Sequence, residues 1–524
     1  MRALLEIRDF TTTKPDAASP ELERFSLALT AGETVVLLGE AGCGKDAVLR
    51  LLSGSLERSE ALSGTIRFGE GERLAAARRP HNPLHYAYIP AAAQHPLSPK
   101  ARVSAQLVRV IAHKLSCPLG AAREELRLSL ERLPGAPAFA SLERLPGELD
   151  MVTLSWGLTA AALAITPELV LCDHAFADIT PVAARTLTDA LLAGQKKLGF
   201  AILYAARIPQ VVARLGGRTI VLHHGRIVEE GDAGHMLGGQ THSYTRSLFR
   251  ALPQPDADRL KRASPRGEPL LQVQGLALQG EKRLRARDAL SFELRRGASL
   301  ALVGEDGSGR RGLARAVLGL DRRPGRILFD AVDLNLLSEG MISRLRRRIA
   351  FVTSAEDVLD PRMTLWDAVD EPLRAYLKLS RELTAGYREA ALKRVGLASF
   401  DGHRAIATLP PFDRRRLQIA RAIVAAPLLV VVDEPLRGLD AIARATIREL
   451  LAEFRVEQQA AFLVITGDFA VARALADDVM VFDHGRVIER GSVRDVLRSP
   501  REGVTRALIE AAEFGPLPRA AEAV

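Results

Sequence analysis

The chain has 524 residues, of which 47% are hydrophobic, 26% charged and 5% aromatic, so it is long enough to bury several cores and is not a single small module. Its three cysteines, Cys43, Cys117 and Cys172, are scattered without a CxxC pair, which excludes structural zinc, an iron–sulfur cluster and a disulfide framework and favours a cytosolic protein. The net charge of +9 suits an anionic partner, but the basic runs at 344–348 and 414–416 have no interleaved aromatic residues, so we expect no nucleic acid to bind.

A glycine-rich loop follows an apolar run early in the chain. Residues 34–38, TVVLL, predict a strand buried on both faces, and GEAGCGK follows at 39–45. Such a loop turns its backbone N–H groups onto a phosphate, and its lysine reaches the β- and γ-phosphates. The predicted nucleotide-binding residues here are Gly39, Gly42, Gly44, Lys45 and Asp46. Because Asp46 replaces the hydroxyl that would hold magnesium and brings a negative charge near the phosphates, we expect weakened nucleotide binding.

An apolar segment and a strand with a terminal acid follow later. The uncharged stretch 151–167 contains hydroxyl residues and ends at a proline, so we expect a buried helix rather than a membrane span. Residues 169–173, LVLCD, predict a strand that ends in Asp173, a candidate magnesium ligand beside the loop. His174 follows this acid. An imidazole can act as a general base, but a lone histidine at a strand end is also typical of a structural residue.

An internal repeat divides the chain. The segment HHGRIVEEG at 223–231 recurs as DHGRVIERG at 483–491, which is 260 residues later, and the same spacing relates Asp173 to Asp433. The repeat predicts two homologous domains, residues 1–252 and 270–524. Between them, the proline-rich and charged segment 253–269 predicts a linker.

The second half repeats the loop with altered chemistry. A predicted strand at 299–303 leads into GEDGSGR at 304–310. The predicted nucleotide-binding residues are Gly304, Gly307, Gly309 and Arg310. Arg310 keeps a cation but carries a wide planar fork, and Arg311 puts a second cation where magnesium would be held. The strand predicted at 428–433 ends in Asp433, the counterpart of Asp173, and a second carboxylate, Glu434, follows it directly.

Each half contains the same series of elements: a strand, a glycine-rich turn, a helix and a later strand with a terminal acid. This series predicts a phosphate-loop α/β architecture in each half. Further motifs are the 223–231 repeat, the Thr-Arg-Ser-Leu segment at 245–248 and the second-half segments 361–364, 432–435 and 438–440. With these motifs, the chain resembles ABC-transporter nucleotide-binding domains of the oligopeptide and dipeptide importer group. In particular, it is similar to the single-chain tandem ATPases of peptide and microcin C importers. The resemblance covers essentially the whole chain.

The resemblance implies a specific organisation. Each half would contain a RecA-like α/β core, an antiparallel β subdomain and a helical subdomain. The halves would pair within the chain, so that ATP and Mg²⁺ lie between one half's phosphate loop and the other half's LSGGQ signature. The family's partners would be two membrane-spanning permease subunits and a solute-binding protein, and the chain would lie peripherally on the cytoplasmic face of the inner membrane.

Several positions depart from the family pattern. The signatures align with LPPFD at 409–413 and LDMVT at 149–153. The glutamine positions hold Ala91 and Thr353, and the switch histidine is missing from 205–207 and replaced by Gly467. The aromatic residue that stacks on adenine aligns near Lys14 and Gly280. Loss of one oriented group commonly slows catalysis by about 10²–10⁴-fold, so we expect hydrolysis to be impaired or lost at both sites.

Two alternatives stay open. The chain is a working importer ATPase if its altered motifs still turn over ATP, with Glu434 orienting the water. A soluble tandem factor acting on ribosomes or DNA is a further alternative, but such relatives carry long basic linkers or zinc modules, and neither is present here.

Overall fold

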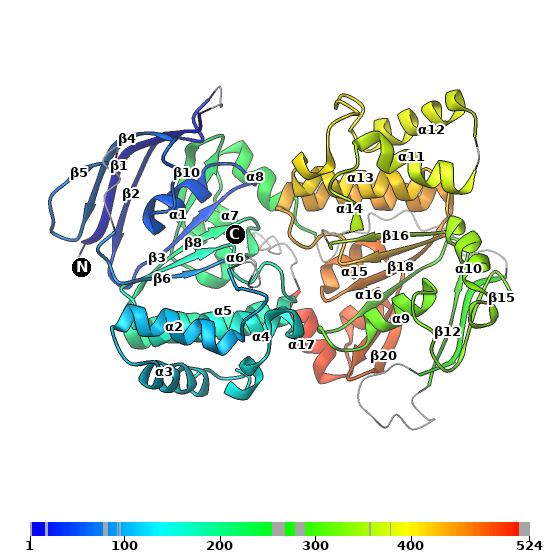
Figure 1. Ribbon diagram of the computed structural model, residues 1–524, viewed down its shortest axis with the longest axis horizontal. Helices are drawn as coiled ribbons and strands as arrows, with labels where there is room; N and C mark the ends of the chain where they lie inside the picture. Colours follow the sequence, from blue (N-terminus) through cyan, green and yellow to red (C-terminus); the bar gives the residue numbers. More distant parts are fainter. Residues whose placement is uncertain are drawn as a thin grey trace, which may run out of the picture.

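The computed structural model describes residues 3–15, 19–76, 82–91, 93, 96–253, 268–277, 289–355, 358–377 and 379–512. The first half is described up to residue 253 and the second from residue 268. The predicted linker 253–269 lies almost entirely outside the described residues, and so does Gly280, the predicted second adenine position. The two halves stand side by side in Figure 1.

The first half begins with an antiparallel sheet whose strand order is β2-β1-β4-β5. Its strands are β1 (Ala3–Thr13), β2 (Leu22–Thr30), β4 (Ala61–Phe68) and β5 (Leu74–Ala75). Buried and exposed side chains alternate along β2, as expected for a strand with one face on a core. That face packs with α1 (Lys45–Ser53) over one side of the second sheet.

The second sheet of this half has the order β10-β9-β3-β8-β7-β6. Its strands are β3 (Thr34–Leu38), β6 (Tyr86–Ile89), β7 (Leu169–Asp173), β8 (Ala201–Ala206), β9 (Arg218–His223) and β10 (Arg226–Asp232). All neighbours are parallel except β9 and β10. Every residue of β3 and β8 is buried, because both faces of the sheet are covered. The parallel strands therefore bring their carboxyl ends to one edge.

Helices cover the other face and form a separate helical part. They are α2 (Val103–Leu115), α3 (Leu119–Glu131), α4 (Met151–Ala164), α5 (Pro181–Leu198), α6 (Gln210–Leu215), α7 (Ala233–Gly238) and α8 (Ser243–Arg250). Most side chains of α4 are buried in this core, in agreement with the buried helix predicted for 151–167. Among the described residues, no helix is long and apolar enough to cross a bilayer.

The second half repeats both sheets in the same strand order. The antiparallel sheet contains β11 (Pro269–Leu276), β12 (Leu290–Arg295), β14 (Arg326–Phe329) and β15 (Val332–Asp333). The mostly parallel sheet contains β13 (Ser299–Val303), β16 (Ile349–Thr353), β17 (Leu429–Asp433), β18 (Ala461–Thr466), β19 (Asp478–Asp483) and β20 (Arg486–Ser492). The α-helices are α9 (Arg310–Val317), α10 (Glu339–Leu345), α11 (Leu365–Tyr376), α12 (Arg381–Arg394), α13 (Pro411–Ile423), α14 (Ala441–Gln458), α15 (Phe469–Leu475), α16 (Val493–Arg498) and α17 (Gly503–Ala511).

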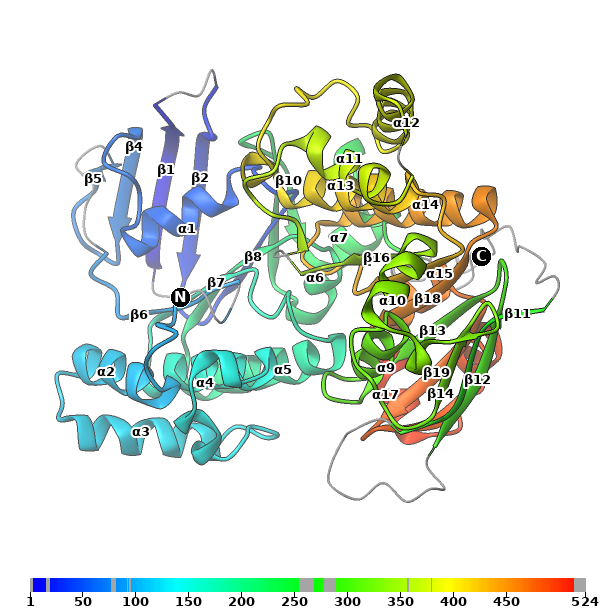
Figure 2. The ribbon, with the colours of Figure 1, turned by 45° about the vertical axis from the view of Figure 1, so that its right-hand side comes forward.

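The halves meet head to tail, with α5 beside α17 and α8 beside α14 (Figures 1 and 2). Near the first phosphate loop, the Asp440 carboxylate accepts a hydrogen bond from the Ala41 amide at 3.2 Å. Near the second loop, the hydroxyl of Thr180 donates to Glu305. Each half therefore contributes a residue, from the segment after its strand-end acid, to the other half's phosphate loop.

Candidate functional site

The first phosphate loop, residues 39–45, connects β3 to α1. Gly42 and Gly44 have φ angles of 77° and 104°, which a residue with a side chain rarely adopts. Lys45 is fully buried, and its Nζ donates to the Glu40 carbonyl of the same loop at 2.7 Å. The loop therefore has the backbone of a phosphate cradle, with an ammonium group held inside it.

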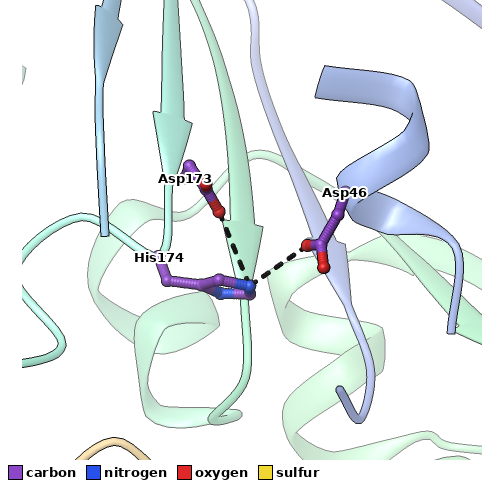
Figure 3. A group of neighbouring side chains, drawn as sticks. All are labelled: Asp46, Asp173 and His174. Carbon is purple, nitrogen blue, oxygen red and sulfur yellow. Dashed lines mark ion pairs between the residues drawn. The ribbon is translucent and has the colours of Figure 1, made fainter. Parts of the chain in front are cut away.

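Two carboxylates and an imidazole converge beside this loop, and we call these three residues the Asp46 cluster (Figure 3). The Nε2 atom of His174 lies 3.4 Å from Oδ1 of Asp46 and 3.7 Å from Oδ1 of Asp173. The Tyr88 hydroxyl donates to Oδ2 of Asp173 at 2.7 Å. Asp46 comes from the start of α1, whereas Asp173 and His174 come from the end of β7. Asp46 is distant in sequence from Asp173 and His174, and it meets them because β3 and β7 end at the same edge of the sheet.

The electrostatics of the Asp46 cluster lower the pKa values of both Asp46 and His174. Burial disfavours ionisation of Asp46, but the contact with His174 and the charge of Lys45 outweigh it and lower the pKa of Asp46 to about 2. Burial lowers the pKa of His174, although Asp46 acts in the opposite direction. The imidazole is therefore in its neutral form at neutral pH, with a nitrogen lone pair available.

The second phosphate loop, residues 304–310, has nearly the same backbone. Gly307 and Gly309 have φ angles of 85° and 97°, and a Cβ atom on Gly304 would lie 2.5 Å from the Phe482 carbonyl oxygen. Its cation is Arg310, which is 2% exposed and donates to the Gly304 carbonyl and, at 3.1 Å, to Asp306. The loop glycines are thus retained around a guanidinium instead of an ammonium group.

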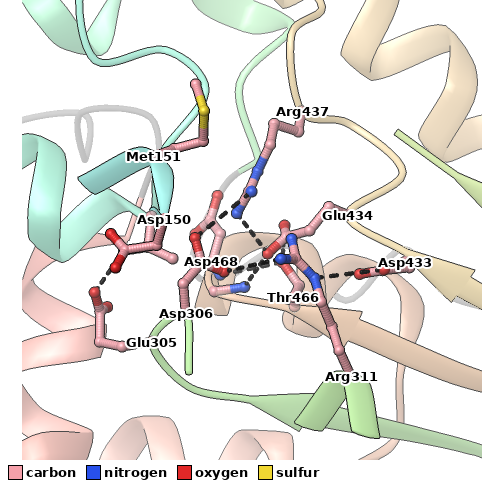
Figure 4. A network of polar contacts seen from close by, with 12 residues as sticks. Asp150, Met151, Glu305, Asp306, Arg311, Asp433, Glu434, Arg437, Thr466 and Asp468 are labelled. Atoms are coloured by element: carbon pink, nitrogen blue, oxygen red, sulfur yellow. Dashed lines mark hydrogen bonds and ion pairs between the residues drawn. The ribbon is translucent and has the colours of Figure 1, made fainter. Parts of the chain in front are cut away.

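Three guanidinium groups and three carboxylates meet at this loop, and we call them the arginine network. Figure 4 shows Arg311 and Arg437 beside the carboxylates of this network. The network consists of Arg310, Arg311 and Arg437 with Asp306, Asp433 and Glu434. Oε1 of Glu434 accepts from Arg310 at 2.7 Å, from Arg437 at 2.8 Å and from the Gly467 amide at 2.9 Å.

The magnesium candidate of the second half belongs to the same network. The Nε atom of Arg311 lies 3.5 Å from Asp433. Burial raises the pKa of Asp433, and Arg311 opposes this shift. The two strand-end acids of the second half are therefore already paired with cations of the protein.

The positions aligned with the signatures lie at the starts of two helices. Asp150 caps α4 by accepting from the Thr153 amide at 2.7 Å, and Figure 4 shows Asp150 pointing toward Glu305 of the second phosphate loop. In the other half, α13 begins at Pro411, where the first residues lack the glycine amides of a signature. Neither of these segments, 149–153 and 409–413, contains a glycine.

A model of the family described as ABC transporter matches residues 22–177 and 287–437. The chain belongs to the ABC transporter family. The match confirms the predicted α/β fold with two tandem ABC domains. An ABC transporter ATP-binding protein of Escherichia coli, YejF, is 31% identical over 92% of this chain and 94% of its own length.

Two further ABC relatives extend over both halves. A peptidoglycan transport ATP-binding protein of Agrobacterium fabrum, also named YejF, is 28% identical and covers 97% of this chain and 96% of its own. The glutathione import ATP-binding protein GsiA of Escherichia coli is 28% identical and covers 94% of this chain and 86% of its own. The resemblance to tandem ABC proteins therefore spans the molecule.

ABC domains bind ATP with Mg²⁺, and the two loops differ in how well they fit this ligand. The first loop fits a phosphate, because Lys45 and the loop glycines are in place, and the carboxylates of Asp46 and Asp173 offer oxygen ligands to a cation. The second loop does not fit Mg²⁺, because Arg311 pairs with the magnesium candidate Asp433 and Glu434 pairs with Arg310.

The structure brings the sequence-predicted residues of each half together and adds others that ABC motifs do not include. Gly39, Gly42, Gly44, Lys45, Asp46, Asp173 and His174 meet in the first half, and Gly304, Gly307, Gly309, Arg310, Asp433 and Glu434 meet in the second. Sequence reasoning missed Tyr88, Arg437 and Asp306. Arg437 follows Glu434 by three residues, and only this spacing hinted at its role.

Proposed function

We propose that the chain is the ATP-binding-type subunit of a peptide-class ABC importer in which neither composite ATP site hydrolyses ATP at the rate usual for the family. The relatives named for peptidoglycan transport and glutathione import support the transport class. The pairing of Glu434 with Arg310 and Arg437 carries the proposal of lost hydrolysis.

The geometry around Glu434 supports the proposal that the catalytic pair of the second half is inactive. Its Oε1 atom accepts three hydrogen bonds, and the Thr466 hydroxyl lies 3.2 Å from Oε2. A carboxylate that already neutralises two guanidinium groups has little remaining capacity to orient a water or accept its proton. The intact Asp-Glu pair therefore serves structure at this site.

The first site is inactive in this proposal for a different reason. His174 replaces the glutamate after Asp173, and it is buried within the Asp46 cluster. The opposite half offers Pro411 and Phe412 where a signature would present a serine hydroxyl and glycine amides to the γ-phosphate. Without that clamp, positioning and charge stabilisation, which supply most of the acceleration in phosphoryl transfer, are missing.

The remaining features of the proposal follow from the family. Residues 1–252 and 270–524 form the two domains, with 253–269 as their linker. Two membrane-spanning permease subunits bind the helical parts, a solute-binding protein delivers the peptide-class solute, and the chain lies on the cytoplasmic face of the inner membrane. ATP with Mg²⁺, where it binds at all, binds weakly at the first loop and stabilises the pairing of the halves.

Steady-state ATP hydrolysis by the purified full chain with Mg²⁺ tests the catalytic part. We expect the wild type and Glu434→Gln to show the same background rate. Magnesium-dependent turnover that Glu434→Gln abolishes would contradict the proposal and favour the working ATPase. A rate that is equal in both proteins and in Lys45→Ala identifies a contaminating enzyme.

Recovery of a tagged chain from detergent-solubilised native membranes tests the transport part. We expect two membrane-spanning subunits to copurify with the tagged chain. Copurification of ribosomal proteins or DNA instead, with release at high salt, would support the soluble factor and refute the importer.

A further inference from the structure

We propose that the Asp46 cluster binds one divalent transition-metal ion, of which Zn²⁺ is the reference probe, directly and without a nucleotide. This inference goes beyond the proposed transport function and does not depend on it. It also revises the sequence-based expectation that the chain holds no zinc, because that expectation considered only ligands close together in sequence.

The distances within the cluster suit a small metal ion. One ligand atom from each of the three residues lies within 4.8 Å of the others. The Nε2 atom of His174 lies 3.4 Å from Asp46 and 3.7 Å from Asp173. Ligands bound to zinc at about 2.0–2.2 Å in a tetrahedron lie about 3.4 Å apart, so the cluster needs only small shifts to enclose an ion.

The buried side chain of His174 also supports a bound metal ion, independently of the distances. Its side chain is 2% exposed, yet among the described residues neither ring nitrogen has a hydrogen-bond partner. The Oδ1 atom of Asp46 also has no hydrogen-bond donor there. Figure 3 shows the imidazole edge directed at both carboxylates. Because buried polar atoms without partners are costly, a bound cation would satisfy the histidine nitrogen and the aspartate oxygen together.

The residues around the cluster orient one ligand and leave the site accessible to solvent. The hydroxyl of Tyr88 holds Oδ2 of Asp173 at 2.7 Å and leaves Oδ1 directed at the cluster, as an outer partner does for a metal ligand. The side chain of Asp46 is 44% exposed, so an ion can enter from solvent, and a water can take a further ligand position.

The donor set favours a transition metal over Mg²⁺. Imidazole nitrogen suits zinc and its neighbours, whereas Mg²⁺ prefers an all-oxygen shell and loses its waters reluctantly. The positive charges of Lys45 and Arg207 act on Asp46 and weaken a purely electrostatic attraction for cations. A metal that forms a strong bond to nitrogen is less affected by these charges.

The second half provides an internal negative control. Glu434 stands where His174 does, and Arg311 stands where Asp46 does. Because Arg311 lies 3.5 Å from Asp433, a cation already faces the carboxylate that a metal would need. We therefore expect one metal ion in each chain.

Titration of the metal-free, nucleotide-free full chain with Zn²⁺ in a calorimeter tests the proposal. We expect one ion per chain in the wild type, binding at least about 100-fold weaker in Asp46→Ser and His174→Gln, and about tenfold weaker in Tyr88→Phe. The matched control is His484→Ala, which removes an exposed histidine lying 3.8 Å from Asp483 and should leave binding unchanged. The visible absorption of bound Co²⁺ should indicate a nitrogen-containing, low-coordinate site in the wild type and in His484→Ala, but not in Asp46→Ser or His174→Gln.

Stability measurements separate loss of a ligand from loss of the fold. Zn²⁺ should raise the thermal midpoint of the wild type and of His484→Ala but not that of Asp46→Ser, whose partly exposed side chain makes it the safer variant. If His174→Gln does not fold, Asp46→Ser decides. The proposal is overturned if the wild type binds no stoichiometric metal, or if Asp46→Ser binds Zn²⁺ as tightly as His484→Ala.

Discussion

The two phosphate loops share a backbone and differ in their charges. Gly42 and Gly44 in the first loop have φ angles of 77° and 104°, and their counterparts Gly307 and Gly309 have 85° and 97°. The first loop leads to two carboxylates and a neutral histidine, whereas the second leads to three arginines that pair with three acids. The first site is left open to an ion, and the second is filled by the protein's own side chains.

The glycines shared by the two loops determine the fold of the loop, whereas the residues that follow them determine its chemistry. The glycines are needed by the turn itself, since a Cβ on Gly39 or Gly304 would lie within 2.5 Å of a neighbouring carbonyl oxygen. The residues after the last glycine carry no such restriction, and Asp46 and Arg311 differ in sign at equivalent places. A retained glycine pattern therefore predicts the loop without predicting a nucleotide.

The substitution with the largest expected effect on stability disrupts the arginine network. Glu434→Ala leaves Arg310 and Arg437 buried without their shared partner, so we expect a loss of about 3–5 kcal/mol in the free energy of unfolding. Denaturant unfolding measures it, with Glu449→Ala, an exposed site on α14, expected to change stability by less than about 0.5 kcal/mol. His174→Ala, the counterpart in the first half, leaves no buried cation unpaired and should cost less. Equal stability of Glu434→Ala and Glu449→Ala would show that the second site is not held by the network.

A smaller effect on stability is expected for Glu229, which has an equivalent residue, Glu489, in the second half. Burial opposes ionisation of Glu229, but its hydrogen bonds to Thr241 and His235 prevail and lower its pKa from 4.5 to about 2. Glu229→Gln should cost about 1.5–3 kcal/mol at neutral pH. Because the folded pKa lies below the ordinary value, this stabilisation is complete above pH 4.5 and is lost as the pH falls toward 2.

Glu489, the counterpart of Glu229, allows the same loss of stability to be compared between the two halves. Glu489 accepts from the amides of Arg501 at 3.0 Å and Glu502 at 3.3 Å, and its pKa is also lowered, against the effect of burial. Thermal unfolding of Glu229→Gln and Glu489→Gln between pH 2 and 7 should show losses in the same direction, with the smaller loss for Glu489→Gln. Opposite directions would mean that the halves diverge beyond the loops.

The smallest expected effect is on nucleotide binding, in which we expect the two loops to differ. Lys45→Ala should weaken equilibrium binding of a labelled ATP analogue by about tenfold, equivalent to about 1.4 kcal/mol, because the loop loses its ammonium group. Arg311→Ala should not weaken it, since Arg311 pairs with Asp433 of the second half and does not contact the first loop. If the wild type and Lys45→Ala bind equally, the first loop does not hold the phosphates.

Local patterns were sufficient to predict the fold and the backbone of the candidate site. The strand at 34–38, the glycine loops and the acids at the ends of β7 and β17 are each encoded within a few residues. The buried helix α4 was also predictable, because its segment is uncharged and ends at a proline. Duplication of these patterns made the family resemblance specific.

The parts that escaped prediction depend on residues far apart in the chain. The helices α2, α3 and α4 lie between Asp46 and His174 in the sequence, so no local spacing indicates their contact. Tyr88 lies on β6 and reaches Asp173 only because β6 and β7 are neighbours in the sheet. The direction in which Arg310 pairs, toward Glu434, follows from the same kind of tertiary neighbourhood.

Because both halves belong to one chain, each substitution occurs only once in the molecule. In a symmetric dimer of identical domains, a change such as serine to aspartate at the phosphate loop would appear at both interfaces and alter both composite sites together. Here Asp46 affects the first loop alone, and Arg311 affects the second alone. Asymmetry within one chain therefore allows the two interfaces to acquire separate roles while the head-to-tail contacts through Asp440 and Thr180 are kept.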